Sequence, residues 1–171
     1  RAAGDPTSQG TALTSPLALG TGVRAVNTEK KFSQGAMITT DNALDIAIDG
    51  DGMFEVLQPD GTFGYSRAGA FSREASGLLV TQSGYPIQPE ISIPPGASNI
   101  SISQDGVITA NLPGENILTE LGQIQIATFA NPRGLTPVGE NLFSATLASG
   151  EPNRGVPVQE GRGKLVQGAL E

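Results

Sequence analysis

The stretch 44–80 constrains the fold of this chain more than any other part of the sequence. In its first run, Leu44, Ile46 and Ile48 alternate with small or acidic residues, which is the period of a strand that buries one face. Two further short runs follow, each separated from the run before it by a turn signal. The three runs begin at Leu44, Met53 and Phe63. The stretch therefore predicts three short strands joined in an antiparallel meander.

Glycine and aspartate mark the turns of this meander. Asp49-Gly50-Asp51-Gly52 and Pro59-Asp60-Gly61 are both typical of hairpin turns, because glycine adopts a positive φ at little cost and aspartate caps its own turn. Other glycines follow or interrupt apolar runs elsewhere in the chain. We assign turn or structural roles to Gly20, Gly22, Gly35, Gly50, Gly52, Gly61, Gly69 and Gly106.

More strands are expected downstream. Four prolines within 86–95 favour a sheet edge or a crossing strap, since proline donates no ladder hydrogen bond. Asp105-Gly106 predicts a hairpin, and between 116 and 129 a helix competes with a strand until alternation favours the strand. The strands expected in this part of the chain are 100–102, 107–112, 123–129, 142–147 and 164–170.

This pattern predicts an all-β fold, drawn as a small antiparallel barrel or sandwich with extended linker arms. Aromatic residues make up only 5% of the chain, so the core must consist mainly of Ile, Leu and Val. Residues 23–32 alternate loosely and are compatible with a further strand. We expect the two ends of the domain, near Val23 and Leu170, to lie on the same side.

The first 22 residues differ in composition from the rest of the chain. They are rich in Gly, Ala, Ser, Thr and Pro, and their few leucines follow neither a helical nor a strand period. Such a segment buries too little apolar surface to order itself alone. Two interpretations remain open, namely a flexible tail and an arm that orders against a neighbouring subunit.

Charge and residue usage exclude several classes of function. The net charge is −7 over 171 residues, which disfavours nucleic acid and anionic membranes as partners, and no apolar run is long enough to span a bilayer. The chain contains no cysteine and no histidine, so it lacks the usual thiolate, general base and zinc ligands. We therefore expect no catalytic residue, metal or cofactor. The missing initiating methionine suggests a piece of a longer protein.

Several residues are weak candidates for chemistry. Asp49 and Asp51 are compatible with a calcium site, but the twelve-residue calcium loop is missing and a turn is the simpler interpretation. The Gly20-Thr21-Gly22 run lacks the lysine and the strand–loop–helix frame of a phosphate loop. Glu55 with Asp49 or Asp60 is a conceivable glycosidase pair, and Ser66 a nucleophile only beside a lysine. Arg67 is expected to pair with a carboxylate across the sheet.

An ordered series of short motifs runs through nearly the whole chain. They are Gly20-Thr21-Gly22-Val23, Phe32-Ser33-Gln34-Gly35, 44–54, Tyr65-Ser66-Arg67-Ala68-Gly69-Ala70-Phe71, Asp105-Gly106-Val107, Leu121-Gly122-Gln123-Ile124, Gly139-Glu140-Asn141-Leu142 and Gln167-Gly168-Ala169-Leu170-Glu171. Each motif is weak alone, but the series resembles the bacterial flagellar rod and hook proteins in order and spacing. The segment before Gly20 is similar to one that distal rod members carry and hook members lack.

The resemblance implies a structural subunit of the flagellar basal body, in a rod that spans the periplasm and transmits torque from motor to hook. Implied partners are other copies of the chain, adjacent rod and hook proteins, and the surrounding ring bushing. Family members have long terminal helices that this sequence lacks. The resemblance therefore divides the chain into an arm and connecting strand (1–36), a β-rich outer domain (37–148) and a returning arm or strand (149–171). The expected subunit contacts of the arm are Leu13, Pro16, Leu17 and Leu19.

Two other classes of function stay open at this stage. A carbohydrate-binding or adhesin-like β module would present exposed aromatic side chains on one face, for which Phe63, Tyr65 and Tyr85 are the candidates. An enzyme would need a deep pocket with at least two titratable groups of shifted pKa. Another rod or hook protein of the same family is a third possibility.

Overall fold

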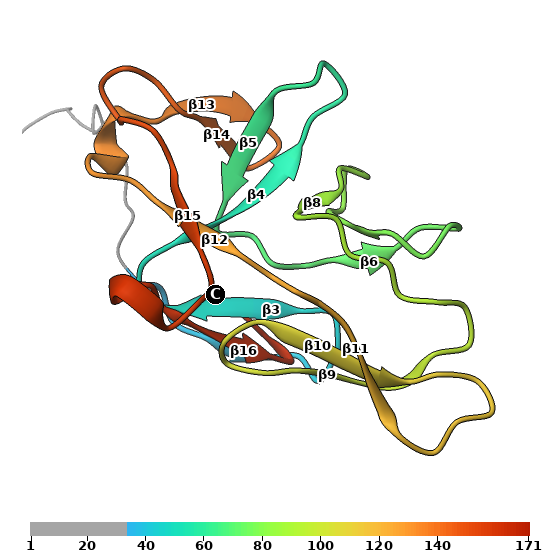
Figure 1. The fold of residues 1–171 in the computed structure, drawn as a ribbon. Helices are drawn as coiled ribbons and strands as arrows, with labels where there is room; N and C mark the ends of the chain where they lie inside the picture. Colours follow the sequence, from blue (N-terminus) through green and yellow to red (C-terminus); the bar gives the residue numbers. More distant parts are fainter. Residues whose placement is uncertain (1–33) are drawn as a thin grey trace, which may run out of the picture. The chain divides into compact units, whose positions relative to one another are not determined.

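The computed structural model describes residues 34–171 (Figure 1). Several predicted features lie outside this range. They are the strand over 23–32, the glycines Gly20 and Gly22, and the contact residues Leu13, Pro16, Leu17 and Leu19. Within it, the regular elements are short strands and two single-turn 3-10 helices, so the all-β prediction is confirmed. The strands are spread over several small antiparallel sheets rather than gathered into one closed barrel.

The largest sheet has seven strands and the next has three. The strand order of the first is β13-β14-β5-β4-β12-β15, with β8 also paired to β4, and that of the second is β11-β10-β9. Three two-stranded pairs, β16-β3, β17-β2 and β6-β7, complete the fold. The strands are β2 (Ile38–Thr39), β3 (Ile46–Asp49), β4 (Met53–Leu57), β5 (Phe63–Ser66), β6 (Ser72–Arg73), β7 (Leu79–Val80), β8 (Ile87–Gln88), β9 (Ser98–Ile102), β10 (Val107–Asn111), β11 (Leu118–Gln123), β12 (Ile126–Thr128), β13 (Thr136–Gly139), β14 (Leu142–Ser144), β15 (Asn153–Gly155), β16 (Lys164–Gln167) and β17 (Ala169–Leu170). The 3-10 helices are η2 (Pro132–Gly134) and η3 (Gln159–Gly161).

The predicted three-strand meander is only half right. β4 and β5 form the expected hairpin, with Phe54 opposite Ser66 and Leu57 opposite Phe63. β3, however, pairs with β16 and not with β4, so the Asp49–Gly52 segment is a crossover between sheets and the hairpin predicted there was wrong.

Glycine geometry explains this crossover. Gly50 and Gly52 have φ of 123° and 135°. A Cβ at Gly50 would lie 2.7 Å from the Gly163 Cα, and one at Gly52 would lie 2.5 Å from the Ile126 Cδ1. The chain thus turns out of the β3 ladder through a gap that only glycine fits.

The downstream strands match their predictions more closely. The hairpin around Asp105-Gly106 is confirmed, with Ile108 of β10 opposite Ile102 of β9. No helix forms between 116 and 129, although the predicted single strand is two strands, β11 against β10 and β12 against β4. The proline-rich run contains one short strand, β8, which pairs with β4, an interior strand of the largest sheet, beside the main strand order.

The core is aliphatic, as the composition required. It is drawn from nearly every sheet and includes one aromatic pair, Phe54 and Phe71, whose rings meet edge to face at 5.0 Å. β3 contributes Ile46, Ala47 and Ile48, which are all buried, so this strand is covered on both faces. Burying each of these larger side chains contributes roughly 1.5–3 kcal/mol.

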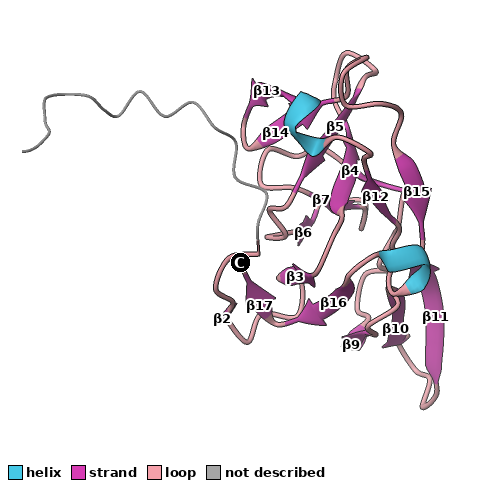
Figure 2. Ribbon diagram, turned by 90° about the vertical axis from the view of Figure 1, so that its left-hand side faces the viewer, coloured by secondary structure: helices cyan, strands magenta, loops and turns pink. Residues whose placement is uncertain are grey.

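The two ends of the described chain lie side by side. β17 pairs antiparallel with β2, placing Leu170 opposite Ile38 and Ala169 opposite Thr39. Figure 2 shows the two strands together beside the C-terminus. The last predicted strand is therefore split at Gly168 into β16 and β17, which pair with β3 and β2 respectively.

Gly69 provides a test of this packing. The Ile46 N–H donates to its carbonyl at 2.9 Å, and a Cβ at Gly69 would lie 1.6 Å from the Ile46 oxygen. Gly69→Ala is expected to lower the free energy of unfolding by about 3 kcal/mol or more, because backbone would have to move. The control is Gly84→Ala, where a Cβ would meet open space and only the left-handed φ of 88° is strained. Equal losses in urea unfolding of the two variants would contradict the close approach.

Candidate functional site

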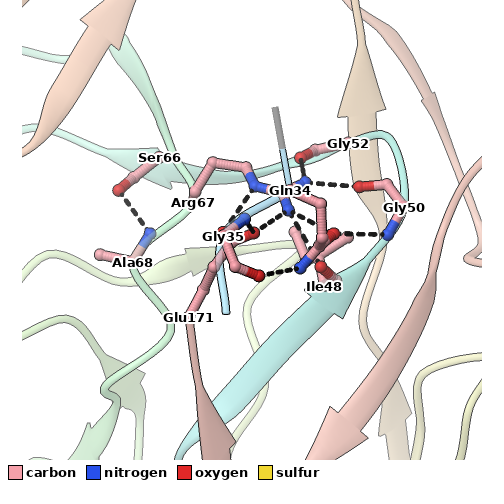
Figure 3. Close-up of polar contacts among 9 residues, drawn as sticks. All are labelled: Gln34, Gly35, Ile48, Gly50, Gly52, Ser66, Arg67, Ala68 and Glu171. Atoms are coloured by element: carbon pink, nitrogen blue, oxygen red, sulfur yellow. Dashed lines mark hydrogen bonds and ion pairs between the residues drawn. The ribbon is translucent and has the colours of Figure 1, made fainter. Parts of the chain in front are cut away.

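Arg67, the residue after β5, lies at a polar junction where four segments meet (Figure 3). Its guanidinium forms a two-pronged ion pair with the Glu171 carboxylate, through Nε to Oε1 at 3.0 Å and through Nη2 to Oε2 at 2.6 Å. The remaining acceptors are the Ile48 carbonyl at 3.0 Å, the Gly50 carbonyl at 2.6 Å, the Gly52 carbonyl at 3.0 Å and Gln34 Oε1 at 3.1 Å. Arg67 thus pairs with a carboxylate, as expected, but the predicted position across the sheet is wrong, because Glu171 follows β17, which belongs to a different sheet from β5.

The other residues of this junction bind one another as well. The Gly35 N–H donates to Glu171 Oε2 at 2.9 Å, and the Gly50 N–H donates to Gln34 Oε1 at 3.0 Å. The side chains of Arg67 and Glu171 are only 18% and 14% exposed. We call these five residues, Gln34, Gly35, Gly50, Arg67 and Glu171, the end clamp.

Electrostatics at the end clamp favour the ionised carboxylate. Burial acts to raise the pKa of Glu171, but hydrogen bonds from Arg67 and from the Gly35 N–H outweigh it, and the pKa lies below its ordinary value of 4.5. An acid whose pKa is lowered by folding adds stability above its ordinary pKa and loses it as the pH falls through the lowered value. The end clamp is therefore complete at neutral pH and weakens in acid.

A second charged cluster is more deeply buried. Glu55, on β4, is 5% exposed and accepts hydrogen bonds from the Tyr65 hydroxyl at 2.6 Å and from Arg154 Nε at 2.7 and 2.9 Å. Burial, reinforced by the neighbouring Glu55, raises the pKa of Tyr65 above its ordinary value of 10, so the hydroxyl stays protonated as a donor. Arg154 also lies over the Phe63 ring at 5.5 Å. The cluster joins β4, β5 and β15.

A shallow pocket of about 140 Å³ lies beside the β5 end of the largest sheet. Among the residues that line it are Ser66, Ala68, Ala70, Tyr85, Glu140 and Leu142. At its edge the Tyr85 hydroxyl donates to Glu140 Oε1 at 2.6 Å, an interaction that raises the pKa of Tyr85. The pocket is much smaller than a typical ligand site, and two titratable groups in its lining, Tyr85 and Glu140, bind each other.

The carboxylates considered for metal or sugar chemistry do not converge. Asp49 pairs with Lys164 at 3.7 Å, and Asp51 bridges to Arg162 through the backbone. Asp60 accepts from Thr62 within its own turn, an interaction that lowers the pKa of Asp60. From residue 34 onward, no group of three or more His, Cys, Asp or Glu side chains is placed to hold a metal ion.

The serine and glycine candidates occupy turns or form hydrogen bonds within the fold. Ser66 Oγ accepts a hydrogen bond from the Ala68 N–H at 2.9 Å. Gly61 and Gly106 have positive φ, of 87° and 91°, and a Cβ at Gly106 would lie 2.5 Å from the Ile124 oxygen. Gly35 belongs to the end clamp, where its N–H is a donor to Glu171.

Sequence reasoning missed four polar residues at these sites: Gln34, Arg154, Arg162 and Glu171. Arg162 is buried, with its guanidinium against Gly155, where a Cβ would lie 2.2 Å from Cζ, and with Nη2 donating to Asn153 Oδ1 at 3.2 Å. A charged residue in a short loop gives no local signal that it will be buried. The one indication in the sequence is that Gln34 and Glu171 both belong to motifs of the ordered series.

Comparison with known proteins agrees with this architecture. A family model described as the flagellar hook protein FlgE/F/G D1 domain matches residues 47–110. The chain belongs to this family of flagellar rod and hook proteins.

Individual relatives of the chain include flagellar rod proteins. The chain is 46% identical over 171 residues to the flagellar basal-body rod protein FlgG of Buchnera aphidicola subsp. Schizaphis graminum, and 40% identical over 171 residues to that of Borreliella burgdorferi. All or nearly all of this chain is covered (100% and 99%), but only 66% and 64% of those proteins, so it spans just under two thirds of their length. Similarity to the rod protein FlgF of Caulobacter vibrioides is lower, at 31% over 121 residues, which are 68% of this chain and 46% of that protein. In the described part of the chain, no helix is long and apolar enough to cross a membrane.

The two tyrosine–glutamate pairs form a matched test of burial. Tyr65→Phe removes a donor from the buried Glu55 carboxylate and is expected to cost about 1–3 kcal/mol of unfolding free energy. Tyr85→Phe removes a hydrogen bond of the same length, 2.6 Å, at the exposed Glu140, and is expected to leave stability unchanged within error. Urea unfolding at pH 7 measures both. An unaffected Tyr65→Phe variant would show that the cluster contributes nothing to stability.

Proposed function

We propose that this chain is part of a structural subunit of the flagellar basal-body rod, of the distal type, that polymerises helically and transmits torque from motor to hook. The observation that carries the proposal is 46% identity along the whole chain to a basal-body rod protein FlgG. The lower identity to FlgF favours the distal type over another rod protein. The proposed location is the rod that spans the periplasm.

The described residues support a structural rather than a catalytic role. Each carboxylate considered as a catalytic group has a partner within the fold, as described above for Glu55, Asp49 and Asp60. A helical polymer needs different complementary patches that form contacts which do not close on themselves, and it needs no reacting group. The proposed partners are other copies of the chain, adjacent rod and hook proteins and the surrounding ring.

The carbohydrate-binding alternative is less well supported by the geometry. It requires several aromatic rings exposed on one face. Tyr65 is buried, and the face of Phe63 lies under Arg154. Of the three candidates, Tyr85 alone has a ring at the surface with neither of these constraints, and a single ring is a poor platform for a sugar.

We further infer the functional division of the chain. Residues 1–36 are proposed as an arm with a connecting strand, 37–148 as the outer β-rich domain and 149–171 as the returning strand. The pairing of β17 with β2 supports the return, because it brings the end of the sequence back beside the residues that follow the arm.

Electron microscopy of basal bodies tests the proposed function. Cells that lack the full-length gene are expected to have truncated rods, and complementation with the gene is expected to restore full length. Rods of normal length in both strains would overturn the proposal. Glycan binding by the full-length protein would then be the next measurement.

The arm has a separate test. We propose that Leu13, Pro16, Leu17 and Leu19 anchor the arm on a neighbouring subunit, where contact area offsets the entropy of ordering it. Deleting 11–19 from the full-length protein is expected to produce rods that are shorter or more flexible, as measured by microscopy. Unchanged length and stiffness would contradict the anchoring role while leaving the rod assignment intact.

A further inference from the structure

The two ends of the described chain are joined by very little β-structure. The β2–β17 ladder holds only two residue pairs, and Ile38 within it is mostly exposed. So short a two-stranded ladder is marginal in water. Because the strands are antiparallel, both ends also leave from the same edge, and force on them opens the pairs one after another.

The end clamp lies where this opening would start. Glu171 is the next residue out from the ladder on β17, Gly35 lies three residues before Ile38 of β2, and the two bind each other through the Gly35 N–H. Arg67 then connects both of them to a different part of the fold, since it follows β5 of the seven-stranded sheet and also binds the carbonyls of the crossover after β3. A planar guanidinium with five N–H groups can hold several segments in one geometry, which a lysine cannot.

We propose that Arg67 is a positioning residue that fixes the direction in which polypeptide attached at either end leaves the β-rich body. This rests on the proposed function, in which the body must keep a defined orientation to the rest of a torque-bearing subunit. Removing the guanidinium leaves the Gly35–Glu171 and Gln34–Gly50 hydrogen bonds to hold residues 34–37 without it. The aliphatic core, which does not include Arg67, keeps the body folded.

These 171 residues contain no cysteine, so introduced cysteines permit a direct measurement of this direction once any cysteine elsewhere in the full-length protein is replaced. Spin labels are attached at Ala36→Cys, an exposed position beside the end clamp, and at Leu147→Cys, an exposed position on a turn held by hydrogen bonds between Thr146 and Ser149. The distance distribution between the labels is recorded by pulsed electron spin resonance in the full-length protein, at concentrations too low for polymerisation.

Arg67→Met is expected to broaden this distribution by on the order of 10 Å, the spread of a free segment of about four residues. Arg67→Lys, which keeps the charge but not the fork of donors, is expected to broaden it by less. The matched control is Arg73→Met at an exposed arginine of β6, which is expected to keep the narrow distribution of the parent. Near-ultraviolet circular dichroism verifies that the body of each variant remains folded.

Acidification provides a readout that a purely structural role would not give. Since the pKa of Glu171 lies below its ordinary value, the distribution of the parent is expected to stay narrow above pH 4.5 and to broaden as the pH falls below it. Glu171→Gln should remove this pH dependence.

A narrow distance distribution in a folded Arg67→Met protein would overturn the positioning role. A distance distribution in the parent that does not change with pH, while the body stays folded, would overturn it as well. Neither outcome bears on the rod-length experiment, so failure of this inference and failure of the proposed function are distinguishable.

Discussion

The guanidinium group of Arg67 donates hydrogen bonds to two backbone carbonyls of a turn that have no partner in a neighbouring strand. The Gly50 and Gly52 carbonyls lie in the crossover between sheets, outside any named strand, where Gly50 is exposed and Gly52 is half-buried. Arg67 donates to both and uses its remaining N–H groups for Gln34 and Glu171. The crossover, the core strand β3 and the two chain ends therefore depend on the same contact.

Arginine has this function more than once in the fold. The sheets are small, so hydrogen bonds within each ladder couple only a few strands, and contacts between sheets must come from side chains. Arg154 connects β15 to the Glu55–Tyr65 pair of the β4–β5 hairpin, and Arg162 packs against Gly155 while binding Asn153. Each reaches several acceptors at once, which suits the rigid fork of arginine better than the single ammonium of lysine.

Whether an interaction could be predicted from the sequence depends on how far apart its two partners lie along the chain. The β4–β5 and β9–β10 hairpins were predictable because both strands and their Asp-Gly turns are neighbours in the chain. The partner of β3 was not, since β16 lies near the other end of the sequence and no local pattern encodes such a pairing. For the same reason the carboxylate requirement of Arg67 could be inferred, but its partner, 104 positions away, could not.

The position of the chain ends has a mechanical consequence. Because β2 and β17 are antiparallel neighbours, the backbone enters and leaves the body at one edge, and tension between the ends does not pass through the seven-stranded sheet. In the proposed rod subunit, force exchanged with neighbouring subunits across the body must, in contrast, reach the rest of the protein through that edge. A core of packed aliphatic side chains resists deformation, so the compliance of the subunit is concentrated in the few polar contacts at the edge. The stiffness of such a subunit is then determined less by its sheets than by how its ends are held.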